Sequence, residues 1–347
     1  MEGKLVLEDG TIFEGSFVLE GDCAGEVVFN TAMTGHQEML TDPNYRGQIL
    51  ATTCPIIGNC GIDDESFESG KVHLSGILMG ELCRTPHHRD SREKFHSFLS
   101  ERGVVALEGL NTRALAIKLR KSGTMKGVIG EKDEETEKLI EKAKKIDENR
   151  NLVAEVSCKK VESEGEGTRI AMLDCGAKRS ISQALLNRGC EVVRFPFNTP
   201  AEKILDSEPE GFLVSNGPGN PAVLRESAET IRGVSERIPT LGICLGHQLI
   251  GMAYGGKTYK LKFGHRGSNQ PVKDIQGRCF ITDQNHGYAV NLQLGREMRA
   301  THFNLNDGSV EGLTHLRKPI SSLQFYPDTG PGDTAYLFNK FLEGVRR

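Results

Sequence analysis

The chain has 347 residues, 37% of them hydrophobic and 26% charged, with a formal net charge of −4 at pH 7. That length is typical of two domains, and the composition is that of a globular protein with enough apolar residues for two cores. The small net charge argues against nucleic acid or an anionic membrane as a partner, and no run of ~18 apolar residues predicts a membrane-spanning helix.

The cysteines and the N-terminal residues indicate in which cellular compartment the protein is expected. Nine cysteines are scattered singly, without a CxxC pair, which is typical of reduced thiols and not of a disulfide framework or a zinc cluster. Residues 1–4 lack the basic-then-apolar pattern of a signal peptide. We therefore expect a cytoplasmic protein without a metal site.

The first half of the chain predicts a mixed, β-rich domain. Two β-prone runs flank the turn signal Asp9-Gly10 and predict a hairpin over residues 4–13. Strands are expected over residues 25–30 and 48–53, an apolar stretch covers 72–82, and helices are expected over 91–102 and 111–120. Asn111 is the expected N-cap of the last of these helices. This half carries no recognisable catalytic motif of its own.

A charge-dense segment and a linker separate this domain from the next one. Residues 131–150 have few apolar positions, and a solvated helix is favoured there over a partner-binding helix. Residues 162–168, Glu-Ser-Glu-Gly-Glu-Gly-Thr, have the composition of a linker. We therefore predict an N-terminal domain over 1–150, a linker over 151–168 and a C-terminal domain over 169–347.

From Arg169 onward, short apolar runs alternate with helical stretches. This alternation predicts an α/β domain with a doubly wound parallel sheet and helices on both faces, an α/β/α arrangement. Ligands of such sheets bind at the carboxyl ends of the strands. Three segments fall at predicted strand ends, namely Cys175, residues 216–219 and Cys244.

Residues 239–248 read Pro-Thr-Leu-Gly-Ile-Cys-Leu-Gly-His-Gln, an apolar run that leads to a cysteine between two glycines. The Gly-x-Cys-x-Gly spacing predicts a nucleophile elbow, in which a strand turns sharply into a helix and holds the middle side chain in a strained, exposed position. The partial positive charge at the N-terminus of the helix favours the thiolate. Cys244 is therefore the candidate nucleophile.

Residues 251–258 satisfy the letters of a phosphate-binding loop, G-x-x-x-x-G-K-[ST]. Such a loop needs a strand before it and a helix after it. Here a helical stretch comes first and the β-prone residues 257–262 follow, so we expect no nucleotide site at this place.

Four motifs of the second half occur in a fixed order: residues 215–221 (Ser-Asn-Gly-Pro-Gly-Asn-Pro), the elbow at 242–248, residues 263–271 (Phe-Gly-His-Arg-Gly-Ser-Asn-Gln-Pro) and residues 284–290 (Gln-Asn-His-Gly-Tyr-Ala-Val). Together they resemble the class I glutamine amidotransferases. In the first half, residues 7–10, 25–38 and 40–43 resemble the opening domain of the small chain of carbamoyl-phosphate synthase, which other amidotransferases lack. The resemblance to that narrower family covers essentially the whole chain.

The resemblance implies a glutamine-hydrolysing subunit. Cys244 would attack the side-chain amide carbon of glutamine, form a thioester and release ammonia. A large partner chain, contacted by the N-terminal domain in a heterodimer, would receive the ammonia through an internal tunnel and make carbamoyl phosphate for arginine and pyrimidine biosynthesis. No cofactor is expected in this chain, since ATP and Mg²⁺ would bind to the large chain.

The resemblance also implies roles for the matching positions. Leu245 and Gly219 would supply the oxyanion hole through their backbone N–H groups. The residues that would hold glutamine are Gly217, Gln248, Asn285, Gly287 and Tyr288. Ala32 stands where the family often carries Ser or Ala near the glutamine, so its contact would be through the backbone.

The closing motif departs from the family pattern. The family reads Gln-x-His-Pro-Glu, whereas residues 324–328 read Gln-Phe-Tyr-Pro-Asp. Tyr326 therefore takes the place of the catalytic His, and Asp328 that of the Glu. The amide nitrogen must be protonated as it leaves, and a phenol with a pKa near ~10 is a poor base at neutral pH, whereas an imidazole near ~6.5 is a good one.

Three interpretations remain open. The chain is a working glutaminase subunit, with full or with weakened chemistry, or a silent subunit that regulates an ammonia-using large chain. The third interpretation is a different cysteine hydrolase on the same fold, against which the N-terminal domain argues. Rescue by His286 or by His247 is disfavoured, because His286 lies in a glutamine-pocket motif and His247 would point away from the thiol. We expect very slow glutamine hydrolysis.

Overall fold

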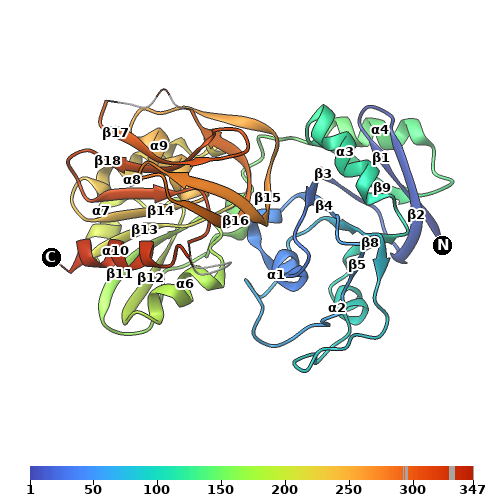
Figure 1. Ribbon diagram of the computed structural model, residues 1–347, viewed down its shortest axis with the longest axis horizontal. Coiled ribbons are helices and arrows are strands. Elements are labelled where there is room, and N and C mark those ends of the chain that lie inside the picture. Colours follow the sequence, from blue (N-terminus) through green and yellow to red (C-terminus); the bar gives the residue numbers. More distant parts are fainter. Residues whose placement is uncertain (292, 294–295, 328–332, 347) are drawn as a thin grey trace. The chain divides into compact units, whose positions relative to one another are not determined.

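The computed structural model describes residues 1–291, 293, 296–327 and 333–346 (Figure 1). The chain divides into two compact units, Met1–Glu148 and Asn149–Arg347, each described by itself. Residues 151–168, the predicted linker, carry the short helix α5 and the strand β10 and belong to the second unit. In the described part of the chain, no helix is both long and apolar enough to cross a membrane.

The first unit is built around a closed β-barrel with the strand order β1-β2-β8-β6-β4-β3-β9. The barrel strands are β1 (Glu2–Leu7), β2 (Ile12–Leu19), β3 (Cys23–Asn30), β4 (Gln48–Thr52), β6 (Gly76–Leu78), β8 (Val105–Glu108) and β9 (Met125–Glu131). A separate pair is formed by β5 (Ile56–Ile57) and β7 (Glu81–Leu82). The helices are α1 (His36–Thr41), the 3₁₀ turn η1 (Pro43–Tyr45), α2 (Phe95–Glu101), α3 (Thr112–Ser122) and α4 (Thr136–Lys144).

This barrel confirms the mixed, β-rich N-terminal domain. Strands β1 and β2 form the expected antiparallel hairpin, and Gly10 in the turn has a φ of +86° that favours glycine. The Asn111 side chain accepts a hydrogen bond from the N–H of Ala114 at 2.9 Å and caps α3 as predicted. The helix expected over 91–102 is shorter, because the backbone around Glu93 instead forms a β-bridge with Ile62.

The charge-dense segment 131–150 forms a one-sided surface helix. Within α4, Leu139 and Ala143 are fully buried and pack with Val6 and Val128 of the barrel. Most of the remaining side chains of the helix are exposed. The helix is therefore held by two apolar residues one turn apart, and its charged face is solvated.

The second unit is an α/β domain whose sheet has the order β10-β12-β11-β13-β14-β19-β18-β16-β15-β17. Its strands are β10 (Glu162–Glu164), β11 (Thr168–Asp174), β12 (Cys190–Pro196), β13 (Gly211–Val214), β14 (Thr240–Ile243), β15 (Thr258–Asp274), β16 (Cys279–Val290), β17 (Met298–Asn304), β18 (Val310–His315) and β19 (Ile320–Leu323). Its helices are α5 (Val153–Val156), α6 (Arg179–Leu186), α7 (Ala201–Leu205), the 3₁₀ turn η2 (Pro221–Val223), α8 (Arg225–Ser235), α9 (Leu245–Ala253) and α10 (Tyr336–Val345).

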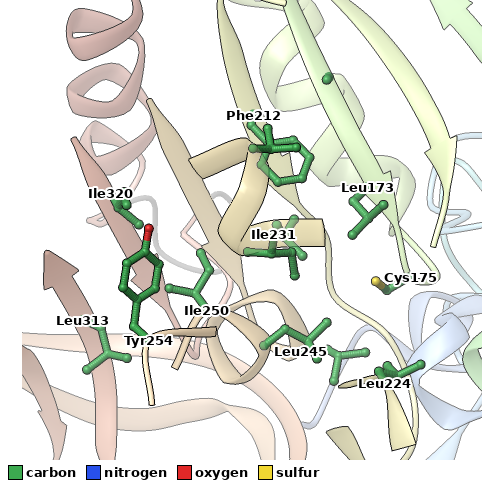
Figure 2. Packing of buried hydrophobic residues seen from close by; sticks show 14 of the residues in the cluster. Leu173, Cys175, Phe212, Leu224, Ile231, Leu245, Ile250, Tyr254, Leu313 and Ile320 are labelled. Atoms are coloured by element: carbon green, nitrogen blue, oxygen red, sulfur yellow. The ribbon is translucent and has the colours of Figure 1, made fainter. Parts of the chain in front are cut away.

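Five neighbouring strands, β12, β11, β13, β14 and β19, are parallel. Alternate residues of β11 face opposite layers: Leu173 packs with helices α7, α8 and α9, and Met172 packs with α6 and α10. Figure 2 shows the first of these layers, with Leu173 and Phe212 of the sheet near Ile231 of α8. The doubly wound α/β/α arrangement is therefore confirmed.

The antiparallel half of this sheet exceeds what the sequence predicted. The sequence indicated a β-prone stretch only over 257–262, whereas β15 continues to Asp274 and pairs with β16. The motifs at 263–271 and 284–290 lie on these two strands. Because β19 joins the parallel and antiparallel halves, the strand pair and the elbow belong to one sheet.

Candidate active site

The elbow has the geometry that its sequence predicted. Strand β14 ends at Ile243, and α9 begins at Leu245. Cys244 between them has φ +54° and ψ −106°, a backbone conformation that non-glycine residues rarely adopt. Its N–H donates to the carbonyl of Leu323 on β19 at 2.8 Å. A strained residue held by surrounding hydrogen bonds is typical of a functional position.

The two glycines of the elbow are required by close backbone contacts. A Cβ on Gly242 would lie 2.7 Å from the carbonyl oxygen of Gly246. A Cβ on Gly246 would lie 2.1 Å from the carbonyl oxygen of Val214 on β13. Both contacts are shorter than van der Waals distance and involve backbone atoms, so only glycine lets α9 approach the sheet this closely.

The expectation of an exposed thiol was wrong. The Cys244 residue is 1% exposed, and its Sγ lies 3.6 Å from the backbone oxygen of Asn285 on β16. It packs in the same apolar cluster as Tyr326. The Gly-x-Cys-x-Gly spacing determines the backbone turn. The solvent exposure of the Cys244 side chain depends instead on strands that are distant in the sequence.

The glycine-rich segment after β13 lies against the elbow. The N–H of Gly246 donates to the carbonyl of Ser215 at 3.0 Å. A Cβ on Gly217 would lie 2.2 Å from the carbonyl oxygen of Cys175 and 2.8 Å from the Leu245 side chain. Gly219 has a φ of +89°. The carboxyl ends of β11, β13 and β14 therefore meet at this place, as expected for a ligand site of a parallel sheet.

Gln248 on α9 connects the elbow to β16. Its Nε2 donates to the carbonyl of Tyr288 at 2.8 Å and to Oε1 of Gln324 at 3.1 Å. Both amide hydrogens are thereby used within the protein. The Oε1 atom is the group of Gln248 that remains to accept a hydrogen bond from a ligand.

Nine of the predicted site residues lie in the second unit around the elbow: Gly217, Gly219, Cys244, Leu245, Gln248, Asn285, Gly287, Tyr288 and Tyr326. Ala32 belongs to the first unit, where its N–H donates to the side chain of Asn30 at the end of β3. Asp328 lies outside the described residues. The roles given to these residues stay predictions.

Tyr326 lies where the resemblance places the catalytic His. It is 1% exposed, and its N–H donates to the carbonyl of Asp283 at 3.0 Å. The ammonium group of Lys178, itself buried, lies 4.3 Å from the centre of the Tyr326 ring. This is cation–π geometry, so the phenol ring is fixed from one side by Lys178 and packs in one cluster with Cys244.

The two histidines considered as substitutes are held by other partners. Nδ1 of His247 lies 3.0 Å from Oγ of Ser322, and burial lowers the pKa of His247 to about 3. The ring nitrogens of His286 lie 2.9 Å from the Tyr288 carbonyl and 2.9 Å from Oε1 of Gln284. Burial lowers the pKa of His286 well below its usual value. Nε2 of His247 is buried without a hydrogen-bond partner, and neither ring forms a hydrogen bond to Cys244 in the described part of the chain.

An ionic network around the buried His265, which contacts one exposed and one buried acidic residue, was not found from the sequence. His265 lies between two carboxylates, with Nε2 3.0 Å from Asp307 and Nδ1 3.4 Å from Glu311. Burial lowers the pKa of His265, but the hydrogen bonds to the two carboxylates outweigh it and raise the pKa to about 9.

Ligand atoms of His265, His286 and Glu311 all lie within 4.8 Å of one another. A positively charged imidazole has no lone pair for a metal, so the group is better described as an ion network. The signal in the sequence was the motif at 263–271, whose His265 contacts acidic residues about forty positions later.

Two family models match the chain. One, described as "Glutamine amidotransferase class-I", matches residues 171–344, and the other, described as "Carbamoyl-phosphate synthase small chain, CPSase domain", matches residues 5–129.

Among curated relatives, the chain is 43% identical to the carbamoyl phosphate synthase small chain of Fusobacterium nucleatum, over 99% of this chain and 98% of the relative. It is 45% identical to the small chain of Archaeoglobus fulgidus, over 100% and 99%. It is 42% identical to the pyrimidine-specific small chain of Bacillus subtilis, over 99% and 96%.

Two solved structures are similar to about half of the chain. A putative GMP synthase subunit from Thermoplasma acidophilum covers 53% of this chain and 96% of its own, with 19% identity and a TM-score of 0.47. A glutamine amidotransferase from Thermotoga maritima covers 52% of this chain and 83% of its own, with 16% identity and a TM-score of 0.39.

Proposed function

Since the chain belongs to the family of carbamoyl phosphate synthase small chains, we propose that it binds glutamine beside Cys244 and hydrolyses it very slowly to glutamate and ammonia. The ammonia passes through an internal tunnel to a large partner chain, which carries ATP and Mg²⁺ and makes carbamoyl phosphate. The proposal places the protein in the cytoplasm, in arginine or pyrimidine biosynthesis.

The observation that carries the proposal is the left-handed backbone of Cys244, with φ +54°, at the meeting point of three strand ends. In this conformation Cys244 lies between the end of β14 and the N-terminus of α9, with its Sγ 3.6 Å from the backbone oxygen of Asn285. In the proposed reaction the sulfur attacks the amide carbon, and the N–H groups of Leu245 and Gly219 stabilise the oxyanion.

The substrate contacts follow from the groups around the thiol. Oε1 of Gln248 is suited to accept a hydrogen bond from the ammonium group of glutamine, since both of its amide hydrogens are used. Backbone groups of Asn285, Gly287 and Tyr288 complete the proposed pocket. Asp328 takes the place of the family's Glu.

Proton transfer is the step at which this chain departs from its family. The proton of the Cys244 thiol must reach the amide nitrogen for ammonia to leave. A phenol holds its proton too tightly at neutral pH to act as this carrier, and neither His247 nor His286 forms a hydrogen bond to Cys244 among the described residues. The expected cost is about 10²- to 10⁴-fold in rate.

The burial of Tyr326 next to Cys244 favours a second candidate function. With no competent proton carrier, the chain acts as a silent subunit that structurally regulates a large chain supplied with free ammonia. The two candidates share the fold, the partner and the elbow, and differ in whether glutamate is released at all.

The proposal is tested by measuring the rate of carbamoyl phosphate synthesis when this chain is combined with the large partner chain. We expect full synthesis with ammonium and a rate about 10²- to 10⁴-fold lower with glutamine. Cys244→Ala should abolish the glutamine-dependent rate and leave the ammonium-dependent rate unchanged. A glutamine-dependent rate that survives Cys244→Ala would contradict the proposed nucleophile. No glutamine-dependent synthesis in the natural chain would favour the silent subunit.

A further inference from the structure

A cavity of about 370 Å³ lies in the second unit, between the sheet and α10. It is lined by Pro239 before β14, by Pro319 before β19 and by one side of α10. Cys244 follows the opposite, carboxyl end of β14 and does not line it. Its volume is within the range of small-ligand sites.

The walls of the cavity are mainly apolar. Side chains from β14, β18, β19 and α10 contribute most of the surface, namely Leu241, Leu313, Ile320, Leu323, Leu337 and Phe341. A sugar or another ligand rich in hydroxyl groups would leave those groups without hydrogen-bond partners against such walls. The walls therefore favour a ligand whose larger part is aliphatic or aromatic.

The charge at the cavity is positive. Lys318 and Lys340 both line it, and among the described residues that do so there is no Asp or Glu. Lys340 on α10 is exposed and, within the described part of the chain, forms no ion pair. Lys318 is partly neutralised by Glu236, whose Oε1 lies 3.6 Å from its Nζ. An anionic group at the mouth would complement these two ammonium groups.

His302 adds one neutral polar group to the wall. Its Nδ1 lies 2.9 Å from Oγ1 of Thr301, and its ring packs edge-on against Phe325. Burial lowers the pKa of His302 to about 4, so the ring is neutral near pH 7. Among the described residues no partner bonds to Nε2, which leaves that nitrogen for a ligand.

We propose that this cavity binds a small carboxylate with an apolar body, such as a medium-chain fatty acid. The apolar body lies between β19 and α10, and the carboxylate lies at the mouth between Lys318 and Lys340. The proposal does not rest on glutamine hydrolysis, since Cys244 and the rest of residues 242–248 do not line the cavity.

Isothermal titration of the full chain with octanoate tests this proposal, with octan-1-ol as the uncharged comparison. We expect one octanoate per chain with a dissociation constant of ~0.1–1 mM, and weaker binding of octan-1-ol. Lys340→Gln should weaken octanoate about 3- to 10-fold and leave octan-1-ol unchanged. Lys203→Gln, on the exposed face of α7 and outside the cavity, is the matched control and should have no effect.

A second variant fills the cavity without removing charge. Ser321 lines it and is half-buried on β19, so Ser321→Leu should occupy part of the space and weaken octanoate and octan-1-ol alike. Absence of saturable octanoate binding at ~10 mM would overturn the proposal. Binding that neither Lys340→Gln nor Ser321→Leu changes would place the ligand elsewhere and would also overturn it.

Discussion

Tyr326→His is expected to raise the rate of glutamate release by about 10²- to 10⁴-fold near pH 7. The side chain at position 326 is buried in the same cluster as Cys244. An imidazole there can take the thiol proton and return it to the departing nitrogen, because its pKa lies near the working pH. The measurement is glutamate formed by the purified chain with its large chain present.

Tyr326→Phe is the matched control for this experiment. It keeps an aromatic ring beside Lys178 but removes the hydroxyl, so it should not raise the rate. Adding Cys244→Ala to the His variant should remove the gained activity. Equal rates for the natural chain and the His variant would show that Tyr326 is not what limits the reaction.

Gly246→Ala should destabilise the second unit by about 3 kcal/mol and remove glutamine hydrolysis. The added Cβ would lie 2.1 Å from the carbonyl oxygen of Val214. That atom belongs to the backbone of β13 and cannot rotate away, so α9 must move away from the sheet. The N-terminus of α9, which lies next to Cys244, would then be displaced as well. Denaturant unfolding measures the loss of stability.

Gly344→Ala provides the control for a methyl group added to a helical glycine. Gly344 lies in α10, and nothing lies within 4 Å of its added Cβ. Its substitution should raise the free energy of unfolding by up to ~1 kcal/mol, because alanine restricts the unfolded chain more than glycine does. Similar stability changes for the two variants would contradict the close contact at Gly246.

The features predicted correctly from the sequence depend on residues close together in the chain. The elbow is one example, because its strand, its glycines and its helix lie within residues 239–253. The cap at Asn111 is another, because the hydrogen bond spans three residues. The alternation of strands and helices from Arg169 likewise uses local periodicity, and it was sufficient for the α/β/α class.

The features that were missed depend on residues far apart in the chain. Burial of the Cys244 thiol is set by β16 and by position 326, about forty and eighty residues later. The pairing of β15 with β16 includes two register shifts, which weaken the alternation that predicts a strand. The ions of the His265 network come from two segments of the chain about forty residues apart. No local pattern encodes such contacts.

Covalent labelling tests most directly whether Cys244 is the nucleophile of a glutamine site. The chloromethyl ketone analogue of glutamine carries an electrophilic carbon near the position of the amide, and peptide mass spectrometry locates its adduct. We predict one adduct, on Cys244, whose formation excess glutamine slows, although Cys60 and Cys279 are the exposed cysteines. Labelling of the exposed cysteines instead, or labelling of Cys244 that glutamine does not slow, would contradict a glutamine site at the elbow.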